Sequence, residues 1–308
     1  MAILAVGSIA FDTIKTPRGK EERVLGGSVT HFSLAASFFT EVRVVGVVGA
    51  DFTPEHEAVM SKRGVRTEGI ERAKGKTFHW SGEYGDNLNE AKTHLTELNV
   101  FESFKPQIPQ EFLDSEVLFL ANIDPVLQRG VREQMARVKL VGGDTMNFWI
   151  GGKRKELAET LKGIDVLLIN DGEAKLLAEN TSLPKAANKI LTMGPKAVVI
   201  KHGEYGATLF FKDGAFGLEG GHPFRAPALP IEEVFDPTGA GDSFAGGFMG
   251  YIASQPKLTR EVLKRAMFYG GVMGSFAVES FGTERIQSLT RDEIEQRFQV
   301  FQELTRLE

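Results

Sequence analysis

Short runs of apolar residues recur along the chain as far as residue 200, and most of them are followed directly by a glycine or an asparagine. Because the runs are apolar throughout rather than alternating with polar residues, they predict strands that are buried on both faces. Amphipathic stretches with helical spacing separate most of them, which indicates a mainly parallel sheet with right-handed helical crossovers. The predicted strands are Ile3–Val6, Val42–Val48, Val117–Ala121, Leu140–Val141, Val166–Ile169 and Ala197–Ile200.

Two segments do not follow this alternation of strands and helices. Residues 12–25 are polar, and in residues 76–99 the aromatic side chains of Phe78, Trp80 and Tyr84 alternate with polar ones, as in a β-hairpin. We expect the two segments to form a small β-sheet lid on a single domain of residues 1–308. Phe78 and Trp80 then either stack on a base or a sugar, or pack the lid against the body or a second subunit.

The composition narrows the class of partner. The 308 residues carry a net charge of -5 and include no cysteine. Nothing in this charge balance points to nucleic acid or to an anionic membrane. The lack of cysteine excludes disulfides and thiolate zinc sites, and it fits a reducing compartment. The N-terminal residues resemble a first strand rather than a signal peptide, and no apolar run approaches the roughly 18 residues of a membrane helix. We therefore expect a cytoplasmic protein with a small-molecule substrate.

The most informative segment is Asp236–Phe244, which reads DPTGAGDSF. Gly239 and Gly241 allow the backbone to approach a ligand, and helical spacing begins at Asp242. A glycine turn that opens a helix directs free N–H groups and the positive end of the helix dipole at an anion such as a phosphoryl group. The same dipole is expected to keep Asp242 ionised, so that it can accept a proton from an attacking hydroxyl. The alternative is a capped helix without a ligand.

Polar residues at the ends of the predicted strands are further candidates, because ligands of such sheets bind beyond the carboxyl ends of the strands. Asn170 and Glu173 follow one strand. A carboxylate there suits Mg²⁺ that is held through water, although the same pair would also serve as the cap of the next helix. Lys201 is either a phosphate contact or a solvated lysine. Asp144 and Asn147 are expected at the same edge, with or without a contact to metal or substrate.

The run Asp236–Phe244 resembles the signature of the ribokinase (PfkB) family of carbohydrate kinases, and the resemblance extends over nearly the whole chain. It implies an α/β fold with a Rossmann-like, mainly parallel sheet flanked by helices and a small β-sheet lid. The implied activity is ATP-dependent phosphoryl transfer to a hydroxyl, in particular a hydroxymethyl group, of a sugar or a sugar-like molecule. By this resemblance Asp242 is the catalytic base, and the N–H groups of Gly239, Ala240 and Gly241 form the anion hole.

The resemblance also assigns residues to ATP and its magnesium ion. Asn170 and Glu173 match the family's NxxE motif, which organises Mg²⁺ and phosphate largely through water. Lys201, Gly203 and Thr238 match positions near the nucleotide phosphates.

A monovalent cation such as K⁺ is a further implied cofactor, because Asp236 and Thr238 lie where many members of the family bind one. A second loop near Phe276–Glu284 must contribute to such a site. The resemblance also suggests a homodimer that forms through the lid.

The substrate side of the resemblance includes one departure from the family pattern. Asp12 matches an aspartate that accepts hydrogen bonds from substrate hydroxyls, and Gly26 and Gly27 match a glycine pair that passes close to the sugar. Four residues after the second glycine the family usually has asparagine, whereas this chain has His31. A histidine also forms hydrogen bonds with a hydroxyl, but with a different geometry. The identity of the sugar therefore stays open.

Three functions remain to be distinguished. The first is a sugar kinase, and the second is a nucleoside kinase of the same family, which shares the catalytic residues and differs in the pocket. The third belongs to another class: a sugar or nucleotide sensor without catalytic activity. The presence of Asp12, Glu173 and Asp242 argues against the sensor, because a sensor does not need a base.

Overall fold

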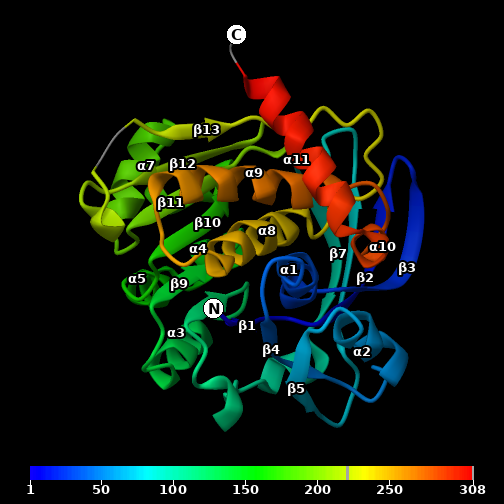
Figure 1. Cartoon of the computed structure of the whole chain (residues 1–308). Helices are drawn as coiled ribbons and strands as arrows, with labels where there is room; N and C mark the ends of the chain where they lie inside the picture. The colour runs from blue at the N-terminus through cyan, green and yellow to red at the C-terminus, as the bar shows by residue number, and fades with distance from the viewer. Residues whose placement is uncertain (220–221, 307–308) are drawn as a thin grey trace.

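The computed structural model of the chain describes residues 1–219 and 222–306 (Figure 1). Within these residues nine strands form one sheet in the order β13-β12-β11-β10-β9-β8-β1-β4-β5. The strands from β5 to β11 pair in parallel, and β12 and β13 are antiparallel to their neighbours. The bounds are β1 (Ile3–Val6), β4 (Val42–Val48), β5 (Arg66–Arg72), β8 (Val117–Leu120), β9 (Leu140–Gly143), β10 (Val166–Asn170), β11 (Ala197–Lys201), β12 (Ala207–Phe211) and β13 (Phe224–Ala226).

Helices cover both faces of this large sheet. The buried side chains of α1, α8, α9 and α11 belong to one hydrophobic cluster, and those of α3, α5, α6 and α7 belong to another on the opposite face (Figure 1). Within the described residues, no helix is both long and apolar enough to cross a bilayer. The helices are α1 (Ser28–Ala36), α2 (Pro54–Ser61), α3 (Pro125–Gln134), α4 (Asn147–Gly152), α5 (Arg154–Leu161), α6 (Asp171–Ala178), α7 (Leu183–Thr192), α8 (Ala240–Ser254), α9 (Arg260–Ala277), α10 (Glu284–Ser288) and α11 (Arg291–Thr305).

The predicted mainly parallel α/β fold is confirmed, and all six apolar runs form strands of the large sheet. The sequence did not predict β5, β12 and β13. The first of these lies at one edge of the sheet and carries charged residues, while β13 at the other edge has only three residues. Edge strands need less apolar surface than central ones, so their hydrophobic signal is weak.

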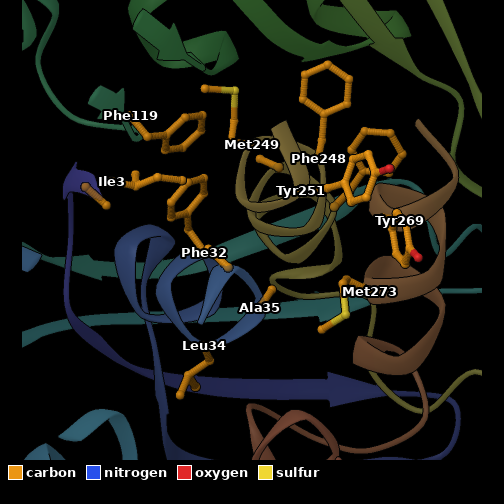
Figure 2. Close-up of a cluster of buried hydrophobic side chains, with 14 of the residues drawn as sticks. Ile3, Phe32, Leu34, Ala35, Phe119, Phe248, Met249, Tyr251, Tyr269 and Met273 are labelled. Carbon is orange, nitrogen blue, oxygen red and sulfur yellow. The ribbon is translucent and has the colours of Figure 1, made fainter. Parts of the chain in front are cut away.

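Close packing against the sheet fixes the position of α8. The ring of Phe32 on α1 stacks on that of Phe119 on β8, with centroids 4.0 Å apart and an angle of 7° between the planes. A Cβ atom on Gly246 would lie 2.4 Å from the carbonyl oxygen of Phe32, so the backbones of α1 and α8 are almost in contact. Phe248 and Met249 of α8 fill the same cluster (Figure 2). The middle of α8 is therefore held firmly against α1 and the sheet, which also fixes where its N-terminus lies.

The predicted lid is a separate four-stranded sheet within the described residues, in the order β3-β2-β6-β7. Its strands are β2 (Ala10–Thr16), β3 (Gly19–Gly26), β6 (Phe78–Tyr84) and β7 (Ala91–Glu97). The pair β2–β6 is parallel, while the outer pairs are antiparallel. β7 is exposed at every residue. The homodimer through the lid stays a prediction.

Polar and aromatic contacts attach the lid to the large sheet. One carboxylate oxygen of Asp51 accepts hydrogen bonds from both the backbone N–H and the hydroxyl of Thr77, each 2.7 Å long. The other oxygen pairs with Arg23 of β3 at 2.7 Å. Phe78 stacks on Phe101 with ring centroids 5.4 Å apart. Of the two predicted uses for Phe78, packing of the lid against the body is therefore the one that it has.

Candidate active site

The predicted glycine turn opens α8 with free backbone donors. Gly239 adopts a left-handed conformation, with φ of 74°, directly before the first residue of the helix. In the described part of the chain, the N–H groups of Gly239, Gly241 and Asp242 have no partner, whereas that of Ala240 donates to Pro237 O at 3.2 Å. The turn thus presents three unused donors at a helix N-terminus. Ala240, which the sequence assigned to the anion hole, uses its N–H group inside the turn.

His31 lies directly against this turn. A Cβ atom on Gly239 would stand 2.4 Å from the His31 Cγ, Cδ2 and Cε1 atoms, so the glycine backbone rests on the face of the imidazole. The side chain of His31 is 2% exposed, and its burial lowers the pKa to about 4. The ring is therefore neutral near pH 7. Neither of its nitrogen atoms has a hydrogen-bond partner among the described residues.

Asp242, in the first turn of α8, is surrounded by charged side chains. Burial raises the pKa of Asp242 to about 6, a nearby Lys201 lowers it, and Glu173 raises it. The sequence predicted that the helix dipole keeps this carboxylate ionised. Burial acts in the opposite direction, yet a pKa near 6 still leaves Asp242 mostly ionised at pH 7. Asp144, which follows β9, is buried, and its burial and the charge of Asp242 raise the pKa of the Asp144 carboxyl.

Lys201 reaches the glycine turn from the end of β11. Its Nζ atom would lie 2.8 Å from a Cβ atom on Gly241. Within the described residues Lys201 forms no ion pair with a carboxylate at 4.0 Å or less, although it lowers the pKa of both Asp144 and Asp242. The lysine therefore lies beside the free backbone donors of the glycine turn rather than in bulk solvent.

Asn170 and Glu173 form a reciprocal cap on α6. The Asn170 side-chain oxygen accepts from the Glu173 N–H group, and Glu173 Oε2 accepts from the Asn170 N–H group, both at 2.8 Å. The capping alternative is thus realised. It also fixes Glu173 beside Lys201, and burial raises the pKa of Glu173.

The side chains of the site limit how many of them could bind one Mg²⁺ ion. Within the described residues, no group of three or more histidine, cysteine, aspartate or glutamate side chains lies close enough to hold a metal ion. Glu173 Oε1, which the cap leaves free in this part of the chain, fits one contact to a hydrated Mg²⁺ whose other ligands are phosphate and water.

Asp236 joins the glycine turn to the second loop that the sequence analysis named. One carboxylate oxygen accepts from the Thr238 N–H group at 2.8 Å, and the other accepts from the Gly282 N–H group at 2.9 Å. The Asp236 side chain is fully buried. The two loops expected around a monovalent cation are therefore adjacent, and the carboxylate and carbonyl oxygens between them are of the type that K⁺ uses.

Asp12 of β2 lies under the glycine pair. A Cβ atom on Gly26 would lie 1.9 Å from Asp12 Oδ2, and one on Gly27 would lie 2.5 Å from the Ser8 carbonyl oxygen. Side chains at either glycine would displace the carboxylate or the backbone. Burial raises the pKa of Asp12 to about 7, and Asp236 and Asp242 add to this rise. The predicted substrate and catalytic carboxylates thus share one electrostatic environment.

Unsatisfied polar atoms mark the same region. Most buried side-chain polar atoms in proteins have a hydrogen-bond partner, so an exception calls for an explanation. Among the described residues, most of the exceptions belong to residues that contact or adjoin Gly239, Asp144 or Asp242. These are both ring nitrogens of His31, Asp144 Oδ1, Thr145 Oγ1 and Ser243 Oγ, and the remaining two are Thr30 Oγ1 and Arg63 Nε. A polar ligand at this site would supply the missing partners.

The structure changes the membership of the site at three residues: it excludes one that the sequence proposed and adds two that it did not. Asn147 opens α4 and is exposed, so of the pair proposed after β9 only Asp144 joins the site. Tyr84 of the lid contacts Thr238, and the side-chain oxygen of Asn89 lies where a Cβ atom on Gly203 would be, 1.9 Å from it. The sequence gave no role in the site to Tyr84 or Asn89. Only the folded arrangement of lid and body brings them there.

The fold and the site together define a class of phosphotransferases. Residues 3–289 match the model of the pfkB family carbohydrate kinases, so the chain belongs to this family. The chain is 29% identical over 279 residues to a cytidine kinase from Thermococcus kodakarensis, a match that covers 85% of this chain and 96% of that relative. This enzyme is accordingly a kinase that transfers a phosphoryl group from ATP to a hydroxyl of a sugar-like acceptor.

Solved structures show the same fold. A Burkholderia thailandensis nucleoside kinase in complex with inosine has a TM-score of 0.77 and 22% identity, with 97% of this chain and 98% of that one covered. A putative ribokinase II from E. coli in complex with ATP and Mg²⁺ has a TM-score of 0.77 and 19% identity, with 97% and 99% covered.

Proposed function

We propose that this kinase phosphorylates the hydroxymethyl group of a nucleoside. The observation that favours a nucleoside over a free sugar is the position of Trp80. It pairs in register with Asp12 on the adjacent strand, so the two side chains lie on the same face of the lid sheet. A flat aromatic ring beside a hydroxyl-binding carboxylate matches a ligand that carries both a base and a sugar.

The conformation of Trp80 supports this use. Its indole N–H group donates to Thr93 Oγ1 at 3.2 Å, and a Cβ atom on Gly82 would lie 2.3 Å from the ring. The indole therefore lies flat along its own strand and is half-buried. Part of the ring rests on the glycine, and in our proposal the part that protein does not cover stacks on the base. The Thermococcus relative, matched over nearly its whole length, is named a cytidine kinase, which also supports a nucleoside acceptor.

In this proposal the ribose lies between the lid and α8. Asp12 accepts hydrogen bonds from ribose hydroxyls, and Gly26 and Gly27 give the sugar room. His31 supplies a neutral imidazole whose nitrogens have no protein partner within the described residues. Because the ring carries no charge near pH 7, it can accept or donate a hydrogen bond to a hydroxyl without a desolvated positive charge.

The phosphates of ATP lie at the glycine turn in this proposal. The free N–H groups of Gly239, Gly241 and Asp242 bind the transferring phosphoryl group, and Lys201 adds a positive charge beside Gly241. Gly203 borders the nucleotide phosphates. Asp236 and Thr238, together with the loop at Gly282, hold the turn and would coordinate K⁺.

Glu173, which Asn170 holds in place, would hold a phosphate-bound Mg²⁺ through water. Bound Mg²⁺ would neutralise charge on the phosphates. Phosphoryl transfer has a loose transition state, so most of the acceleration comes from alignment and charge stabilisation. Asp242 aligns the acceptor hydroxyl and takes its proton, while the lid excludes water that would otherwise attack ATP.

The test is ADP release with ATP and Mg²⁺ against cytidine, inosine, adenosine, ribose, fructose and polyols, with and without K⁺. The variant Asp242→Asn serves as the control for contaminating kinases. We expect the highest kcat/KM for a nucleoside, and activity that depends on Asp242. Selective turnover of a free sugar would replace the nucleoside proposal by the sugar kinase. Turnover that Asp242→Asn retains in full would contradict the assignment of the base.

A further inference from the structure

Tyr84 connects the lid to the catalytic turn. It is the last residue of β6 and lies on the same strand face as Trp80, because side chains an even number of residues apart along a strand share a face. The hydroxyl of Thr238 donates to the Tyr84 oxygen at 3.2 Å, across 154 positions of sequence. Thr238 directly precedes Gly239, so this contact lies beside the free backbone donors of α8.

The surroundings of the Tyr84 hydroxyl are acidic. The carboxylates of Asp236, Asp12 and Asp242 lie close enough to act on it. A tyrosine hydroxyl keeps its proton throughout the physiological pH range. Because Tyr84 is the acceptor in its contact with Thr238, its own proton remains available for a further hydrogen bond. Within the described residues no protein acceptor receives it.

The same hairpin also reaches the other side of the phosphate site. Asn89, in the turn between β6 and β7, packs against Gly203, two residues after Lys201. Lys201 in turn lies against Gly241. The end of the hairpin is therefore in contact with the phosphate site at two separate points, so the position of Tyr84 does not depend on a single hydrogen bond.

We propose that Tyr84 is a catalytic donor that the lid brings to the transferring phosphoryl group. This inference rests on the proposed active site at the glycine turn. Negative charge on the phosphoryl oxygens needs donors that are already in place when transfer begins. The backbone supplies such donors from the α8 side, and the Tyr84 hydroxyl supplies one from the lid side. Full stabilisation is then reached only when the lid covers the acceptor, which links lid closure to transfer and limits hydrolysis of ATP.

The test compares Tyr84→Phe with the wild type. This substitution removes the donor and keeps the ring. Removal of one preorganised oxyanion donor typically lowers kcat by about 10²–10³-fold. We expect a loss of about 10²-fold in kcat, with the KM values for ATP and for the acceptor changed by less than about threefold. The acceptor is whichever of cytidine, inosine and ribose the wild type turns over fastest. Tyr205→Phe, an exposed tyrosine hydroxyl near Lys201, is the matched control and should leave kcat unchanged.

A second readout separates a donor from a simple lid contact. ADP with aluminium fluoride, Mg²⁺ and the acceptor mimics the charge of the phosphoryl group in transfer. Tyr84→Phe should weaken the affinity for this mixture about as much as it lowers kcat, and leave the affinity for ATP nearly unchanged. A variant whose kcat stays within about threefold of the wild type, or whose only change is a higher acceptor KM, would overturn the proposal. Asp242→Asn is measured in parallel. If it too retains activity, the proposed site itself is wrong, and if it alone is inactive, only the role of Tyr84 fails.

Discussion

The central strands of the large sheet and the outer strand β7 of the lid use their side chains in opposite ways. β1, β4 and β8 are buried at every residue, whereas β7 of the lid is exposed at every residue. The strands of the large sheet and the helices packed on them hold the proposed catalytic groups in place, and Asp242 on α8 is the clearest case. β7 adds nothing to the core, but the neighbouring β6 brings Trp80 and Tyr84 to the site. In our proposal the body therefore supplies most of the stability and the catalytic base, and the lid supplies contacts to the acceptor and one further donor.

The largest effect should come from the body. Asp242→Asn removes the base while it preserves the shape of the side chain. General-base catalysis contributes about 10²–10⁴-fold, and we expect kcat to fall by at least 10². The measurement is ADP release at saturating ATP and acceptor. A variant with near-wild-type turnover would show that proton transfer to Asp242 does not matter. The body would then not supply the catalytic base.

The second-largest effect should be on stability, where a substitution in the body should cost far more than one in the lid. Phe32→Ala removes a ring that is fully buried against Phe119. Truncation of a buried phenylalanine costs about 3–5 kcal/mol in the free energy of unfolding. Leu95→Ala on β7, where the side chain is 44% exposed, should change it by no more than about 0.5 kcal/mol. Urea unfolding checks both variants, and equal losses would mean that the lid is a structural part of the core.

The pH dependence of kcat/KM should show both carboxylates. Burial raises the pKa of Asp12 to about 7 and that of Asp242 to about 6. Both must be ionised to accept hydrogen bonds or a proton, so kcat/KM should fall as the pH drops through 7 and fall more steeply below 6. Each protonation contributes up to about tenfold per pH unit.

Lys201 and Glu173 face Asp242, and Asp236 faces Asp12, so these neighbours set the pH at which each fall in kcat/KM occurs. In Asp12→Asn the fall in kcat/KM near pH 7 should disappear, while the fall near pH 6 remains. A kcat/KM that is constant between pH 5 and 8 would contradict the burial of both groups.

Much of the body was predictable because its signals are local. A buried parallel strand is an uninterrupted apolar run, and a glycine turn before a helix is a contiguous motif, so the fold and the Asp236–Phe244 turn are legible in the sequence. The capping pair Asn170 and Glu173 is equally local. The sequence nonetheless left its use open, because the same two residue types suit both a helix cap and a metal site.

The lid contacts were not predictable for the converse reason. Tyr84 and Thr238 are 154 positions apart, and no pattern within either segment indicates that they meet. Ala240 was wrongly assigned for a different reason. Its N–H group donates to the carbonyl oxygen of Pro237, a detail of turn geometry that residue types do not reveal. The pKa of Asp242 is raised by burial, and the sequence, from which only the effect of the helix dipole was expected, does not show how buried the side chain is.

We propose that the lid selects a nucleoside by stacking its base on Trp80. The most direct test is the ratio of kcat/KM for cytidine or inosine to that for ribose, in the wild type and in Trp80→Ala. Stacking of one base on an aromatic ring is worth about 1–3 kcal/mol, which corresponds to about 5- to 150-fold. We predict a loss of this size for the nucleoside and a change of less than about threefold for ribose. Equal losses for both acceptors, or a wild type that prefers ribose, would contradict the account.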